Sequence, residues 1–146
     1  MEYVIFKLGG ENYTIKIDKI KEILVYSQVI ITNLFDEEPY MKGLINLRGE
    51  VIPIIDLRTL FGIKDSKISS NSVIIVANVS GDKLVGAIVD NIVVVKELDL
   101  NQKVQAPPLG VSIDPKYIEG LVRLDVDDMA TILNIDTVLQ LEELCE

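Results

Sequence analysis

The sequence predicts an all-β (mainly β) protein built from two small five-stranded β-barrels packed on each other. Three observations predict this class: a composition rich in β-branched residues, short apolar segments separated by turn residues, and an internal repeat. Hydrophobic residues fill 49% of the 146 positions and Trp is absent, a composition that favours strands. Five short strands per half cannot bury two faces as an open sheet, whereas closure into a barrel removes the exposed edges. A two-sheet sandwich is the alternative.

The chain repeats itself at offsets of 72 to 78 residues, which predicts a structural duplication within a single domain spanning 1–146. The two halves cover approximately 1–63 and 72–146. Each carries a hairpin, a further strand, a loop, a second hairpin and a helix. The residues that match include Gly9 with Gly81, Asp18 with Asp90, Gly43 with Gly120, Leu47 with Leu124, and Asp56 with Asn134.

Each half begins with alternating apolar segments joined by a loop that contains glycine, the pattern of a β-hairpin. Asp18 and Asp90 follow these hairpins as turn formers, and one more strand follows each aspartate. The strands expected from this pattern are 4–8, 13–17 and 20–26 in the first half, and 73–79, 84–89 and 92–98 in the second.

Residues 43–58 read as strand, tight turn, strand and helix start. The glycine of Arg48-Gly49-Glu50 permits the turn. Pro53 lacks an N–H, so we expect its strand to be an edge strand or to carry a local break. Asp56 is expected to cap a short helix that Gly62 ends.

The connections differ between the halves. An acidic loop is expected at 33–39 and a longer loop with three prolines at 101–116, with a polar linker at 64–71 between the halves. A C-terminal helix is expected at 136–144, with Asp136 as its cap and Val138 and Leu139 on its apolar face.

The residues of the 43–58 segment, Gly-Leu-Ile-Asn-Leu-Arg-Gly followed by Val-Ile-Pro-Ile-Ile-Asp-Leu-Arg, resemble the signature of the CheW family. These proteins are adaptors that couple bacterial chemoreceptors to the histidine kinase CheA. The segments at 22–23 and 117–138 fit the family too, so the resemblance covers nearly the whole chain. It implies two SH3-like barrels around a shared core. The acidic loop before Tyr40 departs from the short apolar segment usual in the family, which bears on the choice of receptor.

The composition argues against catalysis. The chain has no His and a single Cys, Cys145, which removes the commonest general base and makes a thiolate enzyme or a zinc site improbable. We therefore expect no enzymatic activity, no cofactor and no bound metal. The net charge of −9 argues against nucleic acid and anionic membranes as partners. No apolar run reaches the roughly 18 residues of a membrane span and no signal peptide is recognisable, so a cytoplasmic protein is expected.

Arg48 is the strongest candidate for recognition. In the repeat its turn is replaced by the acidic stretch Asp125 to Asp128, so the fold itself does not require an arginine there. Arginine is enriched at interface hot spots, and its planar fork binds carboxylates and carbonyls.

The resemblance implies a non-catalytic adaptor with two protein partners, a methyl-accepting chemoreceptor tip and the regulatory domain of CheA, and hence association with membrane receptor arrays through those partners. It places six residues at or near the receptor surface: Ile20, Glu22, Ile23, Gly43, Asn46 and Arg48. Strands near Leu84 and Val93 are expected to face the kinase. The alternative is a small-ligand-binding β-barrel or another protein-interaction module, which a deep pocket with converging polar groups would favour.

Overall fold

The computed structural model describes residues 1–33, 39–64, 67–79, 81–99, 101 and 115–139. Within them the chain forms ten strands, two short α-helices, and 3₁₀ turns at Ile17–Lys19, Tyr26–Gln28 and Pro115–Tyr117. The helices are α1 (Leu57–Phe61) and α2 (Ile135–Val138). The strands are β1 (Glu2–Leu8), β2 (Glu11–Lys16), β3 (Ile20–Val25), β4 (Met41–Leu47), β5 (Glu50–Asp56), β6 (Val73–Val79), β7 (Lys83–Val89), β8 (Asn91–Glu97), β9 (Ile118–Asp125) and β10 (Asp128–Leu133).

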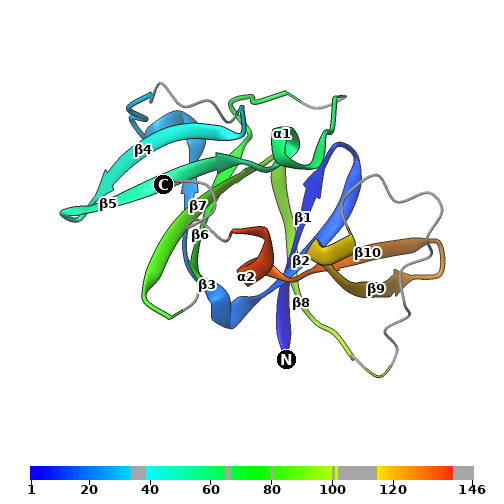
Figure 1. The fold of residues 1–146 in the computed structure, drawn as a ribbon. Coiled ribbons are helices and arrows are strands. Elements are labelled where there is room, and N and C mark those ends of the chain that lie inside the picture. The colour runs from blue at the N-terminus through cyan, green and yellow to red at the C-terminus, as the bar shows by residue number, and fades with distance from the viewer. Residues whose placement is uncertain (34–38, 65–66, 80, 100, 102–114, 140–146) are drawn as a thin grey trace.

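The strands form two five-stranded sheets with the same connectivity (Figure 1). The first, called the β1 unit here, has the order β8-β1-β2-β10-β9, and the second, the β6 unit, has the order β3-β6-β7-β5-β4. Each strand of the β1 unit corresponds to the strand of the β6 unit whose number differs by five, so that β8 corresponds to β3 and β1 corresponds to β6. The single parallel pairing also recurs, as β2 with β10 and β5 with β7. The predicted fold class is therefore confirmed.

The units in space do not coincide with the halves of the sequence. The β1–β2 hairpin pairs with β8 and β10 from the second half, while β3, β4 and β5 pair with β6 and β7. A duplication whose halves exchange hairpins would produce this arrangement. The internal duplication stays a prediction, and the equal connectivity of the units supports it.

Three clusters of buried side chains make up the core. One lies inside the β6 unit and consists of aliphatic residues such as Ile54, Ile74 and Ile88. A second lies inside the β1 unit around Tyr3 and Ile132. The largest combines residues of both units with the two helices. Because side chains alternate between these clusters along β6 and β7, both faces of those strands are buried, which explains their continuous apolar sequence.

The first helix is as predicted. Asp56 caps α1 by accepting a hydrogen bond from the backbone N of Arg58 at 3.0 Å. Gly62 ends it in the left-handed conformation, with φ 72°. Pro53 lies on β5, which is an inner strand and not an edge strand. The parallel ladder with β7 begins only at Ile54, so at Pro53 the strand pairs with β4 alone and the missing N–H breaks no ladder.

The second helix differs from the prediction. Asn134, not Asp136, is its cap, and its Oδ1 accepts from the backbone N of Thr137 at 3.3 Å. Asp136 instead lies in the first turn and forms an ion pair with Lys19 at 3.1 Å. The described helix ends at Val138. Leu139, predicted to be helical, follows the helix as its C-terminal cap, and residues 140–144 lie outside the described residues, as do most of the predicted 33–39 and 101–116 loops.

Candidate recognition surfaces

Glu22 and Arg48 form the most specific polar contact on the surface of the β6 unit. Arg48 donates from Nη1 to Oε2 of Glu22 at 2.8 Å and from Nη2 to Oε1 at 2.9 Å. Glu22 lies on β3, and Arg48 lies in the turn after β4, so the pair joins the two outer strands of the sheet. This bidentate contact fixes the geometry of both side chains.

The turn that presents Arg48 is strained. Arg48 and Gly49 are the two residues between paired Leu47 and Glu50, and both have positive φ, 53° and 85°. This combination is typical of a two-residue hairpin turn that favours Asn or Gly. Arg48 is the only non-glycine residue with positive φ in the part of the chain that the structure describes. A residue held in an unfavourable conformation suggests a functional constraint.

Asn46 supports the same turn. Its Oδ1 accepts a hydrogen bond from the backbone N of Gly49 at 3.1 Å. This contact satisfies a donor at the hairpin tip, because an Asn side chain readily bonds backbone a few residues ahead. Asn46 is exposed, so the predicted site residue both shapes the turn and remains accessible.

The ion pair perturbs both titrating groups. The hydrogen bonds from Arg48 lower the pKa of the Glu22 carboxyl, and those bonds in turn raise the pKa of the Arg48 guanidinium. Two of the five N–H donors of the guanidinium bond Glu22, which leaves three. The Arg48 side chain is 71% exposed, so these donors face solvent and are available to a partner.

The remaining residues expected on the receptor surface differ in accessibility. Ile23 is exposed on β3, whereas Ile20 is half-buried against the core that the two units share. Gly43 is buried, and a Cβ there would collide with the carbonyl oxygen of Thr32. Gly43 therefore allows the segment after β3 to approach β4. All six of the expected residues lie on the β6 unit, on β3, β4 or the turn after β4.

Arg58 belongs to the interior and not to this surface. It donates from Nε and Nη2 to the carboxylate of Asp56 at 2.9 and 2.6 Å. Asp56 is buried and Arg58 is partly buried, with 7% and 11% of their side chains exposed, and the hydrogen bond from Arg58 to Asp56 raises the pKa of the Arg58 guanidinium. Arg58 thus stabilises the start of α1.

The β1 unit carries a different surface at the equivalent place. Val94 lies opposite Ile5 beside a bulge, as Glu22 lies opposite Val76 beside a bulge. Val126 occupies the first position of the two-residue turn after β9, as Arg48 does after β4. The outer strands are joined here by Lys96, whose Nζ donates to the backbone O of Leu124 at 2.9 Å.

We call this region the valine surface; it consists of exposed apolar residues of β8 and of the β9–β10 hairpin, namely Val93, Val94, Val95, Val126 and Met129. Sequence reasoning named only Val93. The repeat offset of 72 pairs Glu22 with Val94, and the offset of 78 pairs Arg48 with Val126, so the repeat could have pointed to these two valines. Leu84, the other residue expected to face the kinase, is half-buried against the interior cluster of the β6 unit.

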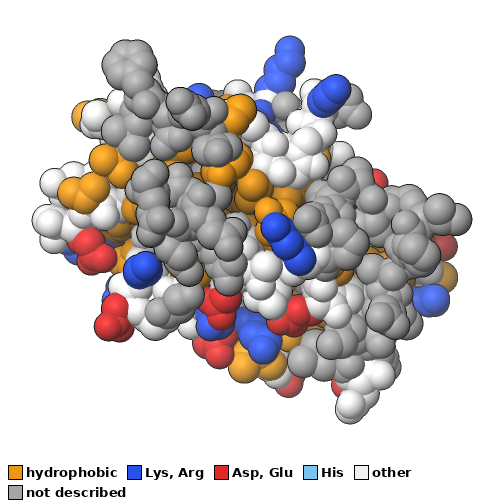
Figure 2. Space-filling model, viewed as in Figure 1, with side chains coloured by type: hydrophobic (Ala, Val, Ile, Leu, Met, Phe, Trp, Pro, Cys, Tyr) orange, Lys and Arg blue, Asp and Glu red, His pale blue; other side chains and the backbone are white. Residues whose placement is uncertain are grey.

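Apolar side chains reach the surface elsewhere as well; Figure 2 shows several such places, with Lys, Arg, Asp and Glu between them, on the face that it draws. Among the described residues there is no group of three or more His, Cys, Asp or Glu side chains that could hold a metal ion. None of the described helices is long and apolar enough to span a bilayer.

Comparison with known proteins gives a consistent result. A family model described as the CheW-like domain matches residues 2–143. The chain is 38% identical to "Chemotaxis protein CheW" of Klebsiella aerogenes, over 98% of this chain and 84% of that protein. It is 31% identical to the protein of the same name from Bacillus subtilis, over 95% and 86%. A solved structure, "scaffolding protein TtCheW" from Thermoanaerobacter tengcongensis, superposes with a TM-score of 0.84 at 34% identity, covering 94% of this chain and 86% of that one.

Proposed function

The chain belongs to the CheW family, and we propose that this chemotaxis adaptor joins a chemoreceptor to the histidine kinase CheA by binding each through a different unit. As a member of a family of scaffolding proteins it is non-catalytic. A small-ligand-binding barrel is not favoured as its main function.

The observation that carries the proposal is the contrast between two equivalent places. One unit presents an exposed guanidinium held by Glu22, and the other presents the valine surface. An adaptor for two unlike proteins needs two surfaces of unlike chemistry, because each surface must favour one partner over the other.

We assign the chemoreceptor tip to the surface around Glu22 and Arg48. The three free N–H donors of Arg48 can bond carboxylate or backbone carbonyl oxygens of a helical hairpin. Ile23, 40% exposed beside the pair, supplies apolar area. An arginine with apolar contact area beside it is common among interface hot spots.

We assign the regulatory domain of CheA to the valine surface. Exposed aliphatic side chains on the outer strands and hairpin tip of a sheet, as Val94 and Val126 are here, are typical of a protein interface. Val93, at the β8 bulge, lies on this surface, whereas Leu84 lies on β7 and is half-buried against the interior of the β6 unit. Bound to both partners, the adaptor would be held beside the membrane by the receptor.

Arg48→Glu tests the receptor assignment. The variant should fold, because the turn is exposed and its counterpart in the β1 unit is acidic. Binding to a receptor-tip fragment should weaken by more than about tenfold, as expected for a hot-spot arginine. Binding to CheA should not change. Calorimetry with each partner and circular dichroism of the variant provide these measurements.

Lys67→Glu is the matched control, since it makes the same charge change at an exposed position of the linker. It should leave both affinities unchanged. If Arg48→Glu folds and binds the receptor fragment as tightly as the unmodified protein does, the assignment of this surface is wrong. If Arg48→Glu unfolds the protein, Arg48 is structural and the assignment also fails.

A further inference from the structure

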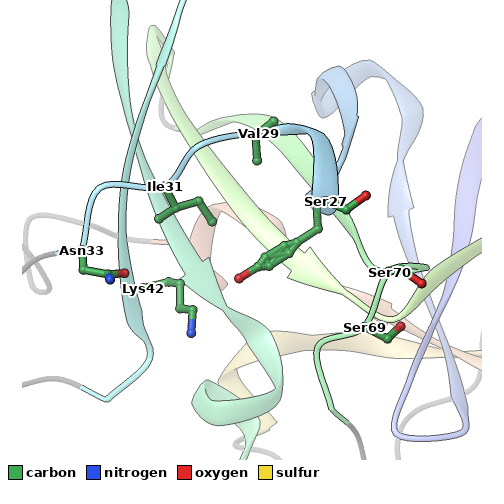
Figure 3. A pocket seen from close by; sticks show the side chains of 8 residues that line it. Ser27, Val29, Ile31, Asn33, Lys42, Ser69 and Ser70 are labelled. Carbon is green, nitrogen blue, oxygen red and sulfur yellow. The ribbon is translucent and has the colours of Figure 1, made fainter.

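A groove on the β6 unit is lined by residues that belong neither to the Glu22–Arg48 pair nor to the valine surface (Figure 3). Its volume is about 600 Å³, within the roughly 300 to 1,000 Å³ usual for small-molecule sites. One wall comes from the segment after β3, the second from Lys42 on β4, and the third from the linker before β6. Its lining consists of Tyr26, Ser27, Val29, Ile31, Asn33, Lys42, Ser69 and Ser70.

The described lining of the groove carries a positive charge, in a protein whose net charge is −9. Among the described residues of the lining, Lys42 is the one ionised side chain and no carboxylate occurs. No acidic group of the described residues forms an ion pair with Lys42. Its ammonium is therefore available to an anion from solution.

Neutral hydrogen-bond donors line the groove on both sides: Asn33 lies on the side of Lys42, and Ser27, Ser69 and Ser70 lie on the opposite side (Figure 3). Ser27, Ser69, Ser70 and Tyr26 contribute hydroxyls, and Asn33 contributes an amide. The Ser69 oxygen accepts from the backbone N of Asn71 at 3.1 Å, which leaves its O–H free to donate to a ligand. Hydroxyl and amide donors beside an ammonium suit an oxyanion, since charge-assisted hydrogen bonds to it are the strong ones.

The walls are fixed before any ligand binds. The backbone N of Tyr26 donates to the Ser72 carbonyl at 3.1 Å, which ties the first wall to the linker. Thr32 and Leu44 exchange two backbone hydrogen bonds of 2.8 and 2.9 Å, which tie the same segment to β4. Preformed walls reduce the entropy cost of binding.

The groove also has an apolar part. Val29 and Ile31 are half-buried, and their side chains lie on the segment between Ser27 and Asn33 in Figure 3. Together with the ring of Tyr26 they can cover a small apolar body, while Lys42 and the hydroxyls hold a charged end.

We propose that this groove binds a small organic oxyanion, a phosphate ester or a carboxylate with a short apolar body, in addition to the adaptor role. The proposal does not depend on either protein partner, because none of the groove residues belongs to the Glu22–Arg48 pair or to the valine surface. It can fail or succeed independently of the proposed function.

The test is an NMR titration of the ¹⁵N-labelled full-length protein with phenyl phosphate, benzoate, inorganic phosphate and benzyl alcohol. Phenyl phosphate or benzoate should give saturable amide shifts confined to residues 26–33, 42–44 and 69–72, and the tighter of the two identifies the preferred anion. Inorganic phosphate should bind more weakly than phenyl phosphate, because it lacks the apolar body. Benzyl alcohol, which lacks the charge, should not saturate.

Lys42→Met should weaken binding of the preferred anion by at least about tenfold, as loss of a charged hydrogen-bond donor implies. Lys42→Arg should retain binding. Lys64→Met is the matched control, because it removes the same charge from an exposed position outside the groove. Absence of saturable shifts overturns the proposal. So does a Lys42→Met protein that binds as well as the unmodified chain, or an equal loss in Lys64→Met.

Discussion

The β1 and β6 units have the same strand order and differ most in what they present to solvent. In the β6 unit the outer strands meet through Glu22 and Arg48. In the β1 unit the equivalent positions are Val94 and Val126, 46% and 79% exposed. The backbone ladders therefore leave the chemistry of these positions unconstrained, and the two copies of one scaffold can serve different partners.

The interiors of the two units also differ. Tyr3 and Thr14 of the β1 unit stand where the β6 unit has Ile74 and Gly86. Both hydroxyls are buried and lack a hydrogen-bond partner among the described residues. The β6 interior is purely aliphatic, and a Cβ at Gly86 would meet Ile54 Cδ1 at 2.5 Å. The β6 interior thus has no room for a methyl group at Gly86. The β1 interior contains hydroxyl groups without partners, and their burial costs free energy.

The largest expected difference between the units concerns the caps of their helices. Asp56→Ala removes the cap of α1 and leaves the partly buried Arg58 without its counter-ion. Losing charged hydrogen bonds of this kind costs about 1.5 to 3 kcal/mol of the free energy of unfolding, in addition to about 1 kcal/mol for the cap. Asn134→Ala removes a neutral cap from α2 and should cost about 1 kcal/mol. Urea denaturation of the two variants measures both values.

Asp56→Asn is the informative companion variant, because it keeps a capping oxygen and removes the charge. Its loss should lie between those of the two alanine variants. Equal losses for Asp56→Ala and Asn134→Ala would show that the Asp56–Arg58 pair adds nothing to its unit.

A smaller difference is expected inside the units. Gly86→Ala should overpack the β6 interior against Ile54 and Ile74, at a cost of about 1 to 3 kcal/mol. Thr14→Val removes an unpartnered hydroxyl with little change of shape, so stability should be unchanged or should rise by up to about 1 kcal/mol. Thermal or urea unfolding tests both. A large loss in Thr14→Val would mean that its hydroxyl is satisfied, for example by a bound water.

The next prediction concerns two variants that give each surface the residue found at the equivalent position of the other. Val94→Glu places a charge on the valine surface, and Glu22→Val removes the carboxylate that holds Arg48. Val94→Glu should weaken the binding of CheA by about tenfold, and Glu22→Val should weaken the binding of the receptor fragment by about tenfold. Both variants should unfold at nearly the same denaturant concentration as the unmodified chain, because both positions lie at the surface. Binding of both partners weakened equally by one variant would show that the surfaces do not act separately.

The smallest expected effect is a pH dependence that comes from the Glu22–Arg48 pair of the β6 unit. The pKa of Glu22 is lowered in the folded state by its hydrogen bonds from Arg48. The contribution of the pair to stability is therefore complete above the pKa of an unfolded glutamate and is lost as the pH falls through the lowered folded value. Arg48→Gln should return the pKa of Glu22 toward its ordinary range. An NMR titration of the side-chain carboxyl would show this, and an unchanged pKa in the variant would mean that the ion pair does not form in solution.

Much of the fold could be predicted from the sequence, because the signals are local. Alternating apolar residues and glycine-containing turns predicted the hairpins, and their strand bounds agree with the structure to within one or two residues. Asp56 and Gly62 marked the ends of α1 since capping depends on neighbours in the chain. The run at 43–58 was specific enough to indicate the family. Arg48 was singled out because the repeat lacks it.

The remaining features depend on contacts between distant segments. Glu22 and Arg48 are 26 residues apart, and they meet because the sheet of the β6 unit curls until its two outer strands, β3 and β4, approach each other. The sequence predicted Asp136 as a helix cap, but in the structure Asp136 pairs with Lys19, which is 117 residues away in the chain. The burial of Gly43 required the approach of Thr32. Local propensities and turn geometry depend on residues that are close together in the sequence. The choice of partner strand, the closure of each sheet and the accessibility of each side chain arise from tertiary packing, where burial and long-range ion pairs outweigh local preference.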